Sequence, residues 1–136
     1  MPTADEFNRR GEGRLPGLIG LEILEVTPGR VTARLGVREQ LLAPNGYLHA
    51  ASVIALADTA AGYGCVASLP EGATSFTTIE LKSNFLGTAR EGDLACEATL
   101  VHGGRTTQVW DAMVTRADGG PIAAFRCTQL VIYPRP

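Results

Sequence analysis

The amino-acid sequence predicts an α+β fold in which about six antiparallel strands form one curved sheet around a single apolar helix. The run at residues 45–65, "NGYLHAASVIALADTAAGYGC", is almost wholly apolar and has no wide polar face. A helix of this kind must be covered on most sides. Six strand-like runs flank it, separated by glycine-bearing turns. A sheet of that size can wrap around one helix and cover it.

Length and composition fit one domain over residues 1–136, with a net charge of −2. That charge argues against general binding of nucleic acid. Cys65, Cys96 and Cys127 lack C-x-x-C spacing, so we expect reduced packing residues of a cytoplasmic protein and no metal site. The chain begins without an apolar signal core, and its longest apolar run contains an aspartate. We therefore expect neither secretion nor a membrane span.

The first half of the chain supplies a short helix and two strands. Residues 3–10 are predicted to be helical, with Thr3 as the N-cap, within an N-terminal arm of residues 1–14. The runs "LIGLEILEV" and "RVTARLGVR" follow as strands, joined by a turn at Pro28-Gly29. Apolar residues alternate with arginine and threonine in the second run, which is typical of a half-buried antiparallel strand.

The second half supplies the central helix and four strands. The helix is predicted over roughly 49–68, and its many alanines and glycines permit close approach of a sheet or a second helix. The four strand-like runs lie near 74–87, 93–102, 105–116 and 121–133. The breaks between them, "TAREGD", "HGGR" and "ADGGP", have turn chemistry.

Asp58 is a lone carboxylate near the middle of this helix, and its apolar neighbours predict that it is buried. A buried, unpaired carboxylate costs folding free energy or shifts its pKa. A fold retains such a group more readily when the group has a task. The structural alternative is an acid at a sheet edge or dimer seam, satisfied by backbone donors.

The start of the helix offers hydrogen-bond donors. The backbone N–H groups of Ala50 and Ala51, with the helix dipole, suit an oxyanion or a polarised carbonyl. His49 either caps the helix or contacts a ligand. Asn45-Gly46 is either a simple turn or a place where a ligand approaches the backbone closely.

Ala50 and Asp58 are too far apart to act together within one chain. Eight residues at 1.5 Å per residue separate them by about 12 Å along one helix. Reacting groups must come within about 3–3.5 Å. Two helices lying antiparallel about a two-fold axis would bring Ala50 of one chain near Asp58 of the other. A shared site therefore implies a homodimer with two equivalent sites.

Gly46, His49 and "LADTA" at 56–60 resemble the helix motif of hotdog-fold acyl-CoA thioesterases of the phenylacetate-degradation (PaaI-like) type, related to one class of 4-hydroxybenzoyl-CoA thioesterase. The resemblance covers roughly residues 15–133. It implies a hotdog fold and hydrolysis of acyl-CoA or aryl-acyl-CoA thioesters, with coenzyme A as part of the substrate and no separate cofactor. It also implies Asp58 as nucleophile or general base and the Ala50 N–H as the donor that polarises the thioester carbonyl.

This sequence departs from the family pattern at one position. The family has Asn or Gln six residues before the histidine, where Ala43 stands here. Either Asn45 takes over that contact with a shifted loop, or the contact is missing.

Further substrate-binding candidates come from the helix and the strand half. Thr59 and Ser83 either position water or substrate or make ordinary hydroxyl bonds. Lys82, Arg90 and Arg105 either meet the phosphates of coenzyme A or are solvated surface charges. Two other functions stay open: a hotdog acyl-CoA hydratase or dehydratase that uses His49 with Asp58, and a non-catalytic acyl-CoA-binding protein. A dimer of dimers is the expected assembly.

Overall fold

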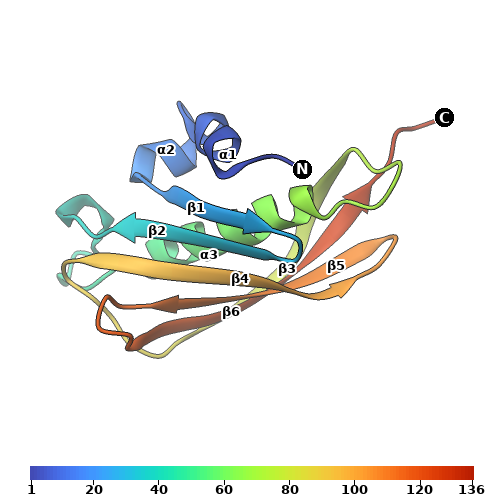
Figure 1. Ribbon diagram of the computed structural model, residues 1–136. Coiled ribbons are helices and arrows are strands. Elements are labelled where there is room, and N and C mark those ends of the chain that lie inside the picture. The colour runs from blue at the N-terminus through green and yellow to red at the C-terminus, as the bar shows by residue number, and fades with distance from the viewer.

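A computed structural model describes residues 1–136 and contains one six-stranded antiparallel sheet with a long helix packed against it (Figure 1). In chain order the elements are α1 (Ala4–Gly11), α2 (Leu15–Ile19), β1 (Glu22–Thr27), β2 (Arg30–Gly36), the 3-10 helix η1 (Glu39–Leu41), α3 (Ala50–Ala67), β3 (Ser75–Phe85), β4 (Asp93–Gly103), β5 (Thr107–Thr115) and β6 (Pro121–Ile132).

The strand order is β1-β2-β4-β5-β6-β3, so β1 and β3 are the two edges of the sheet. All five neighbouring pairs are antiparallel. The chain leaves β2, passes through α3, and then returns as β3 at the far edge. α3 therefore spans the sheet and contacts all six strands, while α1 and α2 pack near β1 (Figure 1).

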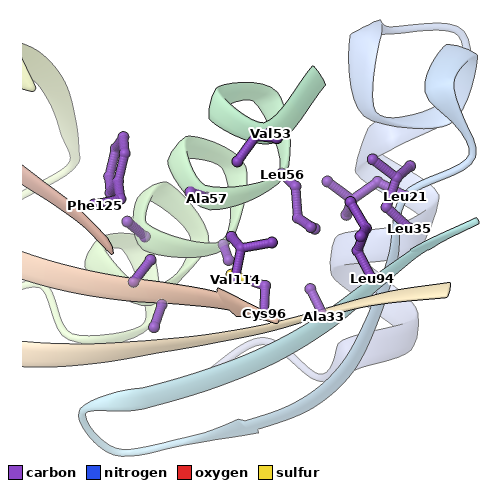
Figure 2. Close-up of a cluster of buried hydrophobic side chains, with 14 of the residues drawn as sticks. Leu21, Ala33, Leu35, Val53, Leu56, Ala57, Leu94, Cys96, Val114 and Phe125 are labelled. Atoms are coloured by element: carbon purple, nitrogen blue, oxygen red, sulfur yellow. The ribbon is translucent and has the colours of Figure 1, made fainter. Parts of the chain in front are cut away.

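The core lies between α3 and the sheet. α3 is long and apolar enough, by length and composition alone, to cross a membrane. Its apolar side chains instead face the strands, and Figure 2 shows Leu56 pointing toward Leu35 and Leu94. These three leucines are at most 1% exposed, and burying each such side chain contributes about 1.5–3 kcal/mol. The predicted alternation in β2 is confirmed, since Val31, Ala33 and Leu35 are buried.

The N-terminal arm covers the outer side of the central helix. Thr3 caps α1 as predicted, in a capping box with Glu6. Phe7 is fully buried and stacks on Tyr63 of α3, with 4.4 Å between ring centroids. The Asn8 side chain both donates to and accepts from the backbone of Ile23. These contacts tie the arm to β1 and α3.

The prediction of one strand over "LIGLEILEV" was partly wrong, because its first residues belong to α2. Pro16 suits the first turn of a helix, and Gly20 ends it in the left-handed region at φ 80°. The Arg38 guanidinium donates to the carbonyls of Leu18 and Ile19 and so satisfies the helix end. β1 consequently begins only at Glu22.

Gly64 explains how the largest core side chain reaches α3. A Cβ atom on Gly64 would lie 2.5 Å from Cη2 of Trp110, whose ring is fully buried. The expectation that Trp110 packs in the core is confirmed. Its indole N–H donates to Gln108, whose side-chain amide donates to the carbonyl of Ser68 beyond the end of α3. Indole and helix thus lie in direct contact.

We predict that Gly64→Ala destabilises the protein by about 1–3 kcal/mol, because the cost of overpacking exceeds the gain of about 1 kcal/mol in helix propensity. Urea denaturation measures the change. Trp110→Phe removes the indole atoms nearest Gly64, so adding Gly64→Ala to that variant should cost much less. Equal costs in both backgrounds would contradict this interpretation.

Candidate active site

Asp58 lies in the middle of α3 and lines a hollow of about 210 Å³ that is mostly apolar. Its carboxylate oxygen Oδ1 is buried and has no hydrogen-bond partner in the chain. Residues from α2, α3 and β3 line the hollow together with Asp58, namely Pro16, Thr59, Gly62, Tyr63, Val66 and Phe76. Asp58 as a whole is half-buried, less than the sequence predicts, because the hollow leaves part of its carboxylate open. Its buried oxygen is unsatisfied.

Burial raises the pKa of the Asp58 carboxyl above its ordinary value. Neither the ion pairs nor the hydrogen bonds of the chain include this carboxylate, so nothing offsets the loss of hydration. A carboxylate with a raised pKa is a stronger base than a solvated one. Poorly solvated carboxylates of this kind serve as general bases or nucleophiles.

The start of α3 presents one free backbone donor. His49 is the N-cap residue, and its Nδ1 accepts a hydrogen bond from the Ala51 N–H at 2.9 Å. This geometry supports the capping interpretation of His49 and places its proton on Nε2. No group of the chain accepts from the Ala50 N–H. Of the two predicted donors, the one at Ala50 is available to a ligand.

The loop before α3 forms a tight turn that sets the direction of the helix start. Gly46 has φ 87°, a left-handed conformation that favours glycine. Asn45 Oδ1 accepts from the Tyr47 N–H at 3.1 Å. A backbone hydrogen bond joins the Ala43 N–H to the Tyr47 carbonyl. Both residues of the Asn45-Gly46 pair therefore build the turn, and the Asn45 amide nitrogen stays free.

The structure does not bring Ala50 and Asp58 together within one chain. Both belong to α3, eight positions apart on one unbroken helix. Their separation along the axis is about 12 Å, as the sequence predicts.

The other candidates occupy different regions. Thr59 lines the hollow beside Asp58, and the Ser83 hydroxyl is buried without a partner on β3. Lys82 faces the opposite side of the sheet, where it lines a separate depression of about 490 Å³ with Arg126 and Asp111.

The three predicted cations are dispersed. The Arg90 guanidinium lies 4.2 Å from the centre of the Tyr47 ring, at the loop that leads into α3. Arg105 lies on the turn between β4 and β5, where its carbonyl accepts from the Tyr133 hydroxyl. Among Lys82, Arg90 and Arg105, Arg90 contacts the loop that precedes the free Ala50 N–H.

Sequence reasoning missed the walls of the hollow. Pro16 lies 42 positions before Asp58 in the chain, and Phe76 lies 18 after it. No local pattern links residues so far apart. Gly62 carried a weak signal, because it follows Asp58 by one helical turn and shares its face.

The cysteines do not form a nucleophilic centre. Burial raises the pKa of Cys65, Cys96 and Cys127 to about 12, so each stays a thiol at neutral pH. The charges of Asp58 and Cys65 add to this effect and raise the pKa of Cys127 further. No group of three or more His, Cys, Asp or Glu side chains is placed to hold a metal ion.

A curved antiparallel sheet wrapped around one central helix defines the hotdog class of proteins. Among solved structures, a mutant of thioesterase PA1618 from Pseudomonas aeruginosa matches with a TM-score of 0.93 and 25% identity, covering 98% of this chain and 96% of that one.

Comparison of sequences gives the family. Residues 45–123 match a protein family described as "Thioesterase superfamily". The 1,4-dihydroxy-2-naphthoyl-CoA hydrolase of Listeria monocytogenes is 33% identical over 110 residues, which are 81% of this chain and 89% of that protein. The enzyme of the same name from Escherichia coli is 26% identical over 96% of this chain and 95% of its own length. The chain therefore belongs to the thioesterase superfamily, and it is a thioester hydrolase.

We predict that Asp58→Asn raises the melting temperature at neutral pH. Since burial raises the pKa of Asp58 above 3.8 in the folded state, ionisation of this group costs stability as the pH rises through that raised pKa. The advantage of the variant should be full above the folded-state pKa and should vanish below the ordinary one. Thermal unfolding from pH 3 to pH 8 tests this. A difference that is constant with pH would show that the charge is not its cause.

Proposed function

We propose that the protein hydrolyses acyl-CoA thioesters in the cytoplasm, with coenzyme A entering only as part of the substrate. The observation that carries this proposal is the unpartnered, buried Oδ1 of Asp58, which borders an apolar hollow on the central helix. The relatives named 1,4-dihydroxy-2-naphthoyl-CoA hydrolases favour an aromatic acyl group. The aromatic ring of Tyr63, which lines the same hollow, is consistent with that class of substrate.

In the proposed mechanism, the thioester carbonyl accepts a hydrogen bond from the Ala50 N–H, which stabilises the negative charge that develops on oxygen. Asp58 of the partner chain then acts in one of two ways. As a nucleophile it attacks the carbonyl carbon, the C–S bond breaks, and water hydrolyses the resulting anhydride. As a general base it takes a proton from a water molecule, which attacks the same carbon; the C–S bond then breaks and the departing thiolate takes up the proton. Both routes release free acid and coenzyme A.

The proposed dimer rests on the edge strand β3. This strand is 11 residues long, has one neighbour, and carries the exposed side chains of Ile79, Leu81 and Phe85. A long, apolar, unpaired edge invites pairing with another strand. A second copy bound along β3 would cover these side chains and set two α3 helices side by side. Two such dimers would give the proposed dimer of dimers.

The first test is thiol release from a panel of short, medium, long and aryl acyl-CoA esters. We expect wild-type turnover on at least one ester and a loss of at least about 100-fold in Asp58→Asn, since general base catalysis contributes that much. Asp118→Asn, the same chemical change at an exposed carboxylate on the turn between β5 and β6, is the control and should keep the activity. A folded dimer that binds the esters without releasing thiol would instead point to an acyl-CoA-binding protein.

The shared site predicts complementation between two inactive variants. Ala50→Pro removes the proposed donor, and proline suits the first helical position because His49 already has an extended backbone. Mixed dimers of Ala50→Pro with Asp58→Asn contain one intact site and one site without either group. Co-expression should restore about a quarter of the wild-type sites. If both groups act within one chain, the mixture will stay inactive.

The hydratase alternative requires an imidazole and a carboxylate at one pair of carbon atoms. His49 uses Nδ1 to cap α3 and lies nine positions before Asp58, so one chain does not supply that pair. Product analysis on an unsaturated acyl-CoA separates the two reactions, because hydration leaves the thioester intact.

A further inference from the structure

Gly62 lies in the interior of α3, where glycine destabilises a helix. Compared with alanine, it lowers the equilibrium constant for helix formation by about fivefold. The position therefore has a packing reason. A Cβ atom on Gly62 would lie 3.0 Å from Cζ of Phe76, closer than ordinary van der Waals contact. The missing side chain lets the tip of the Phe76 ring rest on the helix.

The second helical glycine makes a useful comparison. Gly64 accommodates Trp110, which is fully buried in the core between α3 and the sheet. Phe76 is only partly buried, and its ring borders the hollow that also contains Asp58. Gly64 thus makes room for a core side chain, whereas Gly62 makes room for a side chain that lines the hollow.

The position of this contact relative to the reactive group is defined by the helix. Gly62 follows Asp58 by four residues, so the two lie on one face about 6 Å apart along the axis. An acyl group whose carbonyl carbon meets Asp58 borders this apolar hollow, and within it Phe76 stands over Gly62 one turn away. The remaining apolar walls are Pro16, Val66 and the ring of Tyr63.

We propose that Phe76, seated on Gly62, closes the far end of the acyl pocket and sets the size of the acyl group that the enzyme accepts. This inference rests on the proposed thioesterase function and adds a residue that determines specificity. Phe76 does not touch the reacting atoms in this proposal, so its removal changes which substrates are selected more than it changes the chemical step.

The test compares Phe76→Ala, Phe76→Leu and Gly62→Ala across acetyl-, butyryl-, hexanoyl-, benzoyl- and naphthoyl-CoA. Phe76→Ala should raise the ratio of kcat/KM for naphthoyl-CoA over that for butyryl-CoA by about tenfold or more, and Phe76→Leu by less. Gly62→Ala pushes the ring tip into the hollow and should lower the same ratio. Leu24→Ala, which shortens an exposed side chain on the other face of the sheet, is the control and should leave it unchanged.

A second readout needs no hydrolysis. Each Phe76 and Gly62 variant is combined with Asp58→Asn, and the dissociation constants of the same esters are measured. The ranking by size should shift in the same direction in both measurements. A uniform fall across the panel in both Phe76 variants would show a merely structural ring and overturn the inference. If wild-type protein releases no thiol but the ranking of affinities still shifts with Phe76, the proposed function fails while the inference about the pocket stands.

Discussion

α3 has no wide polar face, and this property dictates most of what surrounds it. A helix of this kind cannot leave one face in water, so the sheet covers one side and the N-terminal arm covers part of the other. The connection from β2 through α3 to β3 places the strand that follows the helix at the far edge of the sheet. The hollow forms where α2, α3 and β3 meet.

The candidate active site lowers the stability of α3, the helix that carries it. Asp58 interrupts an apolar helix with a carboxylate that the chain leaves unpaired, and Gly62 weakens the same helix one turn later. The well-packed neighbours Leu56, Ala57, Ala60 and Ala61, each fully buried, offset these costs. A rigid helix in turn holds the carboxylate in a fixed direction, which a loop would not do.

Much of the fold follows from local patterns. The central helix and the strands agree with the predicted ranges to within a few residues, because apolar periodicity and glycine-bearing turns mark them clearly. α2 was missed because the run "LIG" is equally compatible with a strand, and the decisive features are Pro16 before it and the Arg38 contacts that end it. Those contacts join residues about 20 positions apart, which no local window contains.

Only part of the candidate site could be predicted from the sequence, for a related reason. Asp58 and Ala50 stand out on one helix, but which face a strand residue occupies depends on register. β3 contains an irregularity between Thr78 and Glu80 that breaks strict alternation along the strand. Phe76 and Ser83 consequently share the helix side although their spacing is odd, and Lys82 lies on the other side. Strict alternation along β3 would have placed Phe76 on the same face of the sheet as Lys82 and on the opposite face from Ser83.

The helices α1 and α2, which precede the first strand, are attached to the molecule differently from the strands of the sheet. Pro16 of α2 contributes a wall of the hollow, yet the two helices are held by a few contacts: the stacking of Phe7 on Tyr63, the Asn8 bonds to Ile23, and the Arg38 bonds at the end of α2. Sequence change in this short segment can therefore reshape one side of the cavity without disturbing strand pairing. Substitutions in the residues that precede the first strand can therefore change substrate preference at little cost in folding stability.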